Sequence, residues 1–167
     1  RVFEHLVSRY QSKVLTNCRY LANATDADDL AQEVFVKAYF ALDRFEGRSM
    51  FKTWIQRIKV NHCLNFLQRK RELAVSLDDP ALDVRGLSHP QASPLAQLEN
   101  RERQTRIQRV LRQMSETLRV PLVLREVDHC SYREIAGFLG LGESAVKMRV
   151  KRAREEFRRR FVEAQHD

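Results

Sequence analysis

The sequence lacks any long apolar run. Its longest runs, such as residues 120–124, cover only a few positions, far short of the roughly 20 that a helix needs to cross a bilayer. A secretory signal is not visible either. We therefore expect a chain that does not insert directly into a membrane.

Cysteine is scarce, and Cys18, Cys63 and Cys130 are widely spaced without any Cys-x-x-Cys pair. An odd set of this kind argues against a disulfide framework and predicts thiols in a reducing compartment. His62 and His129 each precede a cysteine, which makes four candidate zinc ligands. Neighbouring residues on a helix diverge by about 100°, however, and seldom hold one ion together. We therefore expect no metal and no cofactor.

Proline and glycine are also few, and three of the four prolines lie close together. Residues 73–98 contain Pro80, Pro90, Pro94 and Gly86, with several Ser and Asp and no helical period. This composition is typical of a flexible linker.

Helical periodicity holds on both sides of this segment, and no strand pattern competes with it. The sequence therefore predicts an all-α chain with domains at residues 1–72 and 95–167, joined by a linker at 73–94. In the second domain we expect an apolar helical set of Leu95, Leu98, Ile107, Val110, Leu111 and Met114. We further expect Pro121 to lie at the start of a helix that leads into a helix-turn-helix.

Acidic residues are in the minority, with 22 Asp and Glu against 30 Lys and Arg, a net charge of +8. Such a balance favours a polyanionic partner, because neutralised phosphates release their counterions. The basic residues are concentrated in two stretches. Residues 44–71 have eight Lys or Arg against one Glu, and residues 143–160 have eight against three Glu.

A helix, a tight turn and a second helix are predicted near the end of the chain. Ser131 and Glu134 form a capping box at the start of the first helix, which should end near Gly140. We expect Gly140 and Gly142 to supply the positive φ that reverses the chain. The second helix should begin at about Glu143.

The second of these helices has distinct faces. Its inward stripe, at spacings of four, three and four, is Val146, Val150, Ala153 and Phe157. The opposite face carries Ser144, Met148, Lys151 and Arg152, flanked by Lys147, Arg149 and Arg154. A basic amphipathic helix after a glycine turn has the geometry of a major-groove recognition helix, although a basic face can also be merely solvated.

An acidic surface is predicted on an earlier helix, which Thr25 and Asp28 begin with a capping box and which runs to about Leu42. Its inward face is Val34, Phe35, Ala38 and Leu42. Its outward side carries Asp26, Asp29, Glu33 and Lys37, with Gln32 at the margin. The helix dipole explains the first-turn acids at a few tenths of a kcal/mol each, but it explains Glu33 poorly.

A third helix, at residues 51–71, follows a short loop whose ends Phe45 and Phe51 should anchor. Its inward set is Phe51, Trp54, Ile55 and Ile58, and a second stripe is Arg57, Asn61, Asn65 and Gln68. Amide and guanidinium groups beside an aromatic ring can hydrogen-bond base edges and stack on unpaired bases. The alternative is that the amides are simply exposed.

In these motifs the sequence resembles the small extracytoplasmic-function (ECF) sigma factors of the bacterial sigma-70 family. Residues 26–39 and 44–71 are similar to the family's second conserved region, and residues 131–154 to its fourth. The resemblance implies a non-enzymatic, cytoplasmic protein that binds core RNA polymerase and directs it to promoter DNA. It also implies stress-responsive control by an anti-sigma factor, which in this group is often membrane-anchored.

The resemblance implies roles for individual residues. Polymerase contacts fall on Asp26, Asp29, Gln32 and Glu33. For the minus-ten element, the resemblance implies that Asn61, beside the loop at 45–51, lies where the family captures a flipped base. It also implies that DNA is contacted by Arg57, Asn65, Arg69 and Lys70. For the minus-thirty-five element, the residues expected to read the bases are Ser144, Ala145, Met148 and Arg152. Those expected to contact phosphates are Lys147, Arg149 and Lys151, and Arg133 is expected to contact the DNA as well.

Two departures from the family pattern concern the recognition helix. Ser144 and Ala145 stand where relatives often have Gly-Thr, and Met148 stands where a small polar residue is usual. Met148 offers an apolar group suited to a thymine methyl, so the base preference there is open.

Three rival functions are weighed against this one. A sigma-like decoy that titrates an anti-sigma factor should have lost its basic residues, and here both basic stretches persist. A metal-dependent nuclease using Asp26, Asp29 and Glu33 lacks a second acidic cluster. An ordinary helix-turn-helix repressor explains the second domain only.

Overall fold

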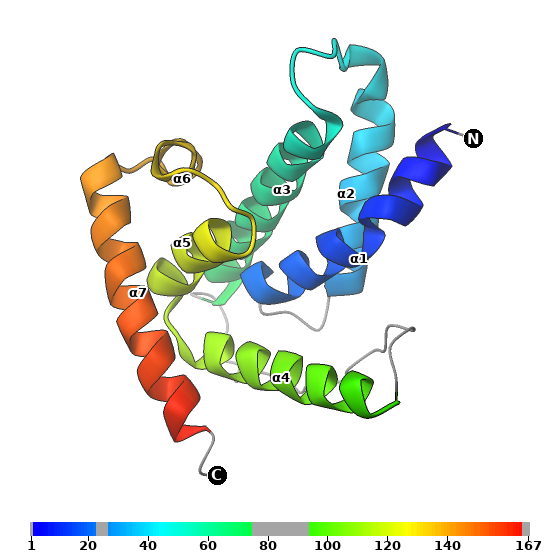
Figure 1. Ribbon diagram of the computed structural model, residues 1–167. Coiled ribbons are helices and arrows are strands. Elements are labelled where there is room, and N and C mark those ends of the chain that lie inside the picture. The colour runs from blue at the N-terminus through cyan, green and yellow to red at the C-terminus, as the bar shows by residue number, and fades with distance from the viewer. Residues whose placement is uncertain (1, 23–26, 75–93, 165–167) are drawn as a thin grey trace. The chain divides into compact units, whose positions relative to one another are not determined.

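A computed structural model of the chain describes residues 2–22, 27–74 and 94–164. All regular structure within these ranges is helical, which confirms the predicted all-α class (Figure 1). The chain divides into two compact units, Arg1–Leu82 and Asp83–Asp167, called here the first and second unit. Among the described helices, none combines the length and the apolar character needed to span a membrane. Thr25, Asp26 and most of the predicted linker lie outside the described residues.

The first unit is built from three helices and a short 3-10 turn. These are α1 (Val2–Ala22), α2 (Ala27–Ala41), η1 (Leu42–Arg44) and α3 (Phe51–Ala74), and each α-helix packs on the other two. The core forms where their apolar stripes meet: Val14, Cys18, Leu21, Leu30, Val34, Ala38, Ile55, Val60, Cys63 and Leu67 are buried. The Sγ atoms of Cys18 and Cys63 lie 3.7 Å apart in this core. As predicted, α2 turns Val34, Phe35 and Ala38 inward.

An aromatic cluster fixes the loop between η1 and α3. The ring of Trp54 lies 5.0 Å from that of Phe45 and 5.4 Å from that of Phe51, centroid to centroid. Tyr10 of α1 joins at 5.7 Å from Phe51. Gly47 turns the loop with φ 69°, a conformation that side chains with a Cβ rarely adopt. The two phenylalanines thus anchor the loop as the sequence predicted.

The second unit is built from four helices, α4 (Pro94–Gln113), α5 (Glu116–Glu126), α6 (Tyr132–Leu139) and α7 (Glu143–Glu163). Helix α7 packs against the other three. The buried side chains include Val110, Leu111, Met114, Val120, Leu122, Val123, Leu124, Ile135, Val146, Val150 and Ala153. The predicted inward stripe of the recognition helix is confirmed at Val146, Val150 and Ala153, whereas Phe157 is only half-buried.

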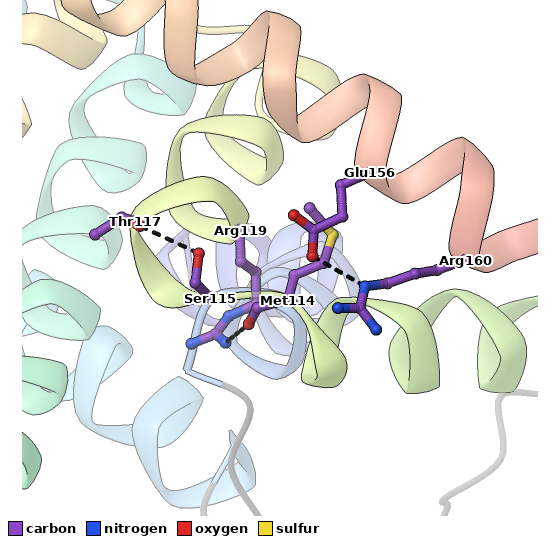
Figure 2. A network of polar contacts seen from close by, with 6 residues as sticks. All are labelled: Met114, Ser115, Thr117, Arg119, Glu156 and Arg160. Atoms are coloured by element: carbon purple, nitrogen blue, oxygen red, sulfur yellow. Dashed lines mark hydrogen bonds and ion pairs between the residues drawn. The ribbon is translucent and has the colours of Figure 1, made fainter.

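A polar contact holds the corner between α4 and α5, where the Arg119 guanidinium donates from Nη1 to the Met114 carbonyl at 3.3 Å (Figure 2). Figure 2 also shows a bond within α7, in which Arg160 Nε donates to Glu156 Oε1 at 2.9 Å. Burial lowers the pKa of Arg119, partly offset by Glu116. Because Met114 and Arg119 are both buried, this corner is a fixed part of the second unit.

One expectation for α4 and one for α5 were wrong. Pro121 lies inside α5, five residues after its start at Glu116. Its missing N–H leaves the Thr117 carbonyl without the usual helical donor, but Pro121 is fully buried and its packing offsets that loss. Leu98, expected on an apolar stripe, is 58% exposed.

The turn between α6 and α7 follows the predicted motif with one difference. Ser131 Oγ accepts from the Glu134 N–H at 3.1 Å, and the Glu134 carboxylate accepts from the Ser131 N–H at 2.8 Å, which confirms the capping box. Gly140 caps α6 with φ 63° and ψ 37°. Gly142, also expected at positive φ, has φ −75° and ψ 153°. One left-handed residue therefore suffices to end α6, and Gly142 serves as the extended N-cap of α7.

Replacing the cap serine should loosen α6. We expect Ser131→Ala to cost about 1 kcal/mol of local stability, the usual loss for a capping side chain. Hydrogen exchange of a peptide covering α6 measures it. Ser115→Ala is the matched control, since Ser115 stands at the N-cap of α5 without a side-chain cap bond. Equal losses at both sites would contradict the role of the capping box.

Candidate functional site

The outward side of α2 forms an acidic surface, defined here as Asp29, Gln32 and Glu33. All three side chains are exposed, because Val34 and Ala38 turn the opposite side of the helix into the core. Asp26, predicted beside them, lies outside the described residues. No acid of this surface is buried, so it can meet a basic partner without structural change.

A polar row runs along the outward side of α3, and we define it as Arg57, Asn61, Asn65, Arg69 and Lys70. Every member is exposed, as predicted. Arg69 Nε lies 3.4 Å from the Asn65 carbonyl, a long bond that holds the guanidinium loosely along the helix. The row begins beside the half-buried Trp54 and its aromatic cluster. It therefore offers amide, guanidinium and ring groups on one helix.

The acidic surface and the far end of the polar row meet in a groove of about 500 Å³. Asp29 and Glu33 line it from α2, and Arg69 and Lys70 line it from α3. Leu30, Phe66 and Leu73 supply its apolar lining. The groove thus brings together residues that we expected to bind polymerase and residues that we expected to bind DNA. Helical periodicity alone does not reveal this proximity.

His62, considered from the sequence only as a candidate zinc ligand, contacts Glu33. Its Nε2 atom is 2.7 Å from Glu33 Oε2, with the imidazole 2% exposed and the Glu33 side chain 59% exposed. Burial lowers the pKa of His62, the charge of Lys37 lowers it further, and Glu33 partly raises it. The histidine is therefore neutral at pH 7. The spacing of Ile55, Ile58 and His62 was the available signal, since it extends the inward stripe by one turn.

The outward side of α7 carries the predicted readout residues. Ser144, Ala145, Lys147, Met148, Lys151 and Arg152 are exposed, as is Arg133 on α6. Arg149 is half-buried. Met148, with 50% of its surface exposed, presents a large apolar group in the middle of a basic face.

The ring of Tyr132, at the start of α6, contacts two cationic side chains. The sequence did not predict this cluster. The Arg125 guanidinium lies 4.5 Å from its ring centroid and the Lys147 ammonium 5.8 Å. Arg125 Nη1 also donates to the Cys130 carbonyl at 2.8 Å. Cations over an aromatic face are held by its quadrupole, so Lys147 is ordered toward α6 instead of extending freely.

An ion pair ties α7 to α5. Arg154 Nε donates to Glu126 Oε1 at 2.7 Å, and its Nη2 lies 2.5 Å from the same oxygen. The hydrogen bond that Arg154 donates to Glu126 raises the pKa of Arg154. The sequence placed Arg154 on the flank of the basic face. Its pairing with Glu126 shows that its guanidinium contacts α5.

Two family models match the chain. The model described as Sigma-70 region 2 matches residues 6–72, and the model described as Sigma-70, region 4 matches residues 104–157. The first match covers the acidic surface and the polar row. The second covers the Tyr132 cluster and the exposed side of α7.

Relatives and solved structures agree with these matches. The chain is 35% identical to the ECF RNA polymerase sigma-E factor of Escherichia coli K12 over 93% of this chain and 84% of that protein. It is 35% identical to the RNA polymerase sigma-H factor of Pseudomonas aeruginosa over 93% and 83%. The fold is similar to that of sigma factor RpoE from Bartonella quintana in complex with the anti-sigma factor NepR (TM-score 0.72, 22% identity, 96% of each chain). It is also similar to CnrH in complex with the cytosolic domain of CnrY (TM-score 0.62, 28% identity, 98% and 89%).

Titration of His62 should make the first unit less stable in acid. Unfolded, the imidazole has a pKa of about 6.5. Folded, its pKa is lower, so below about pH 6.5 the unfolded chain binds more protons and the free energy of unfolding falls. One group gives a slope of at most about 1.4 kcal/mol per pH unit.

Urea unfolding between pH 7.5 and 5.5 measures this slope through the fluorescence of Trp54, the chain's one tryptophan. We expect His62→Gln to flatten it. His5→Gln, at an exposed position of α1, should leave it unchanged. A slope that survives His62→Gln would assign the acid sensitivity to other groups.

The ion pair between α5 and α7 should contribute little to stability. Both side chains are close to half exposed, and exposed pairs are worth about 0–1 kcal/mol. We expect Glu126→Gln to lower the free energy of unfolding by no more than this in 50 mM salt, and by less in 500 mM salt. Denaturant unfolding followed by circular dichroism measures it, with Glu163→Gln as control. A loss above about 2 kcal/mol would show a stronger role in the fold.

Proposed function

Since this chain belongs to the ECF group of sigma-70 factors, we propose that its two units divide polymerase docking and promoter recognition between the surfaces described above. Factors of this group are non-catalytic and direct RNA polymerase to promoters, and the chain is a promoter-directing factor of this kind. The observation that carries the assignment is the pair of family matches, residues 6–72 and 104–157, which together include every surface involved.

The acidic surface of α2 docks the chain on core RNA polymerase. A cluster of exposed carboxylates is unexpected on a chain with net charge +8, and it favours a partner with a basic face. Complementary charge steers such an encounter and fixes its orientation. Asp26, Asp29, Gln32 and Glu33 are the docking residues in this proposal.

The polar row of α3 and the loop before it recognise the minus-ten element. Extruding a base costs a few kcal/mol of unstacking, which stacking and hydrogen bonds must offset. Asn61 supplies donors and an acceptor for a base edge. Arg57, Asn65, Arg69 and Lys70 hold the backbone around it, and all four are exposed on α3.

The exposed side of α7 reads the minus-thirty-five element. Ser144, Ala145, Met148 and Arg152 face the bases, while Arg133, Lys147, Arg149 and Lys151 hold phosphates, which position a protein without specifying sequence. Met148 and Ala145 are apolar and exposed. They favour thymine methyl groups over hydrogen-bonding base edges at the positions they contact.

An anti-sigma factor controls the chain in this proposal. The structures of Bartonella quintana RpoE with NepR and of CnrH with the cytosolic domain of CnrY support it. We further propose that the partner is membrane-anchored and that the chain works in the cytoplasm beside the polymerase, responding to stress.

Run-off transcription tests the function. The chain is added to purified core RNA polymerase on a promoter library, and the start sites are sequenced. We expect initiation at a defined pair of elements near minus ten and minus thirty-five. Core binding without initiation would favour a sigma-like decoy that only titrates an anti-sigma factor.

Substitutions on α7 separate base readout from phosphate contact. Arg152→Ala should lower promoter affinity by about 1–3 kcal/mol and relax sequence preference near minus thirty-five. Lys151→Ala should weaken all promoters alike and reduce the salt dependence of binding by about one counterion. Holoenzyme binding to labelled promoter at several salt concentrations measures both. Arg103→Ala removes a charge from an exposed position of α4 and is expected to change neither. Uniform behaviour of all three variants would contradict the assignment.

A further inference from the structure

His62 combines burial with a polar ring that core packing does not explain. It lies on α3 with 3% of its surface exposed, where an apolar side chain of similar volume would pack without desolvation cost. Within the described part of the chain, neither ring nitrogen makes a well-aligned hydrogen bond. Buried polar groups in proteins are nearly always satisfied, so an exception requires a reason.

The close neighbour of this ring is Glu33, a member of the acidic surface. Glu33 Oε2 lies 2.7 Å from His62 Nε2, although that carboxylate is well exposed. Since burial keeps the imidazole neutral, the nitrogen beside an ionised carboxylate must be the one that carries the hydrogen. The ring therefore places the nitrogen that carries the hydrogen 2.7 Å from one oxygen of an exposed carboxylate, a close polar contact although not a well-aligned hydrogen bond.

Two cations act at this site, because the charges of Lys37 and Arg69 both lower the pKa of His62. Lys37 lies one turn further along α2, the spacing at which Glu and Lys pair on a helix surface. Arg69 lines the groove opposite Glu33. Either pair would turn the carboxylate inward along the protein surface and neutralise it. The contact with His62 engages Oε2, and the Glu33 side chain stays 59% exposed.

We propose that His62 is a positioning residue for polymerase docking, which holds the Glu33 carboxylate in the orientation that the partner's cation meets. This proposal rests on the docking role of the acidic surface. An exposed glutamate that is ordered before binding loses less freedom when it docks. The usual cost of ordering one side chain corresponds to about a 2- to 10-fold change in dissociation constant.

A double-mutant cycle tests the coupling. The full chain, labelled at its N-terminus, is titrated with purified core RNA polymerase and followed by fluorescence anisotropy. We expect His62→Leu to raise the dissociation constant about 2- to 10-fold. In a Glu33→Gln background the same substitution should have no further effect, because the carboxylate to be positioned is gone. Equal effects in both backgrounds would overturn the proposal.

Conservative replacements separate positioning from packing. Glutamine carries an amide N–H near the place of Nε2, so His62→Gln should bind core polymerase within about 2-fold of the natural chain. Asparagine is shorter and reaches only near Nδ1, so His62→Asn should behave as His62→Leu. This pair carries the test if His62→Leu fails to fold. Similar affinities for Gln and Asn would overturn the proposal.

Leu67→Ala is the matched control for stability. Leu67 is buried on the same helix and lies outside the groove, so its truncation should destabilise the first unit without changing core affinity. An equal loss of affinity in Leu67→Ala would reduce the effect of His62 to general destabilisation. If Glu33→Gln itself leaves affinity unchanged while the chain still binds core, docking at Glu33 and the role of His62 both fail. In that case the promoter-directing function proposed above is unaffected, because the chain still binds core polymerase.

Discussion

The packing of α2 against α3 determines what the first unit presents to its surroundings. A helix that buries one stripe must expose the residues opposite, because successive positions rotate by about 100°. Burial of Val34 and Ala38 therefore sends Asp29 and Glu33 outward, and burial of Ile55 and Cys63 sends Asn61 and Asn65 outward. Two surfaces of opposite charge on neighbouring helices follow from one apolar contact. The same contact brings the acids of α2 beside Arg69 and Lys70 in a single groove.

The second unit meets a similar requirement with a turn. Gly140 at φ 63° ends α6 and lets α7 begin three residues later, so that Val146, Val150 and Ala153 are buried while the basic side of α7 remains open. The buried stripe holds α7 in place, and two exposed contacts, Tyr132 with Lys147 and Glu126 with Arg154, add little to its stability. The recognition surface is therefore presented by a rigid helix, a prerequisite for reading base edges at fixed positions.

The sequence predicted what depends on local periodicity and failed where a contact joins distant segments. Helix faces, the Ser131 capping box and the exposed rows on α3 and α7 all follow from spacing, and all are present. The contact of His62 with Glu33 joins residues 29 positions apart, and that of Arg154 with Glu126 joins residues 28 apart. Both depend on where two helices cross, which a periodic pattern does not specify. Pro121 was misplaced for a related reason: its cost in a helix is local, whereas the burial that compensates it is tertiary.

The three buried cysteines offer a way to measure how often each unit opens. Cys18 and Cys63 are 0% exposed in the core of the first unit, and Cys130 is 2% exposed in the second. A thiol reagent attacks an accessible thiolate, so each cysteine reacts only when its own unit opens. Alkylation rates, resolved by peptide mass, would report the opening equilibrium of each unit separately. The natural cysteines thus serve as probes of local opening in each unit, and no engineered label is needed for this measurement.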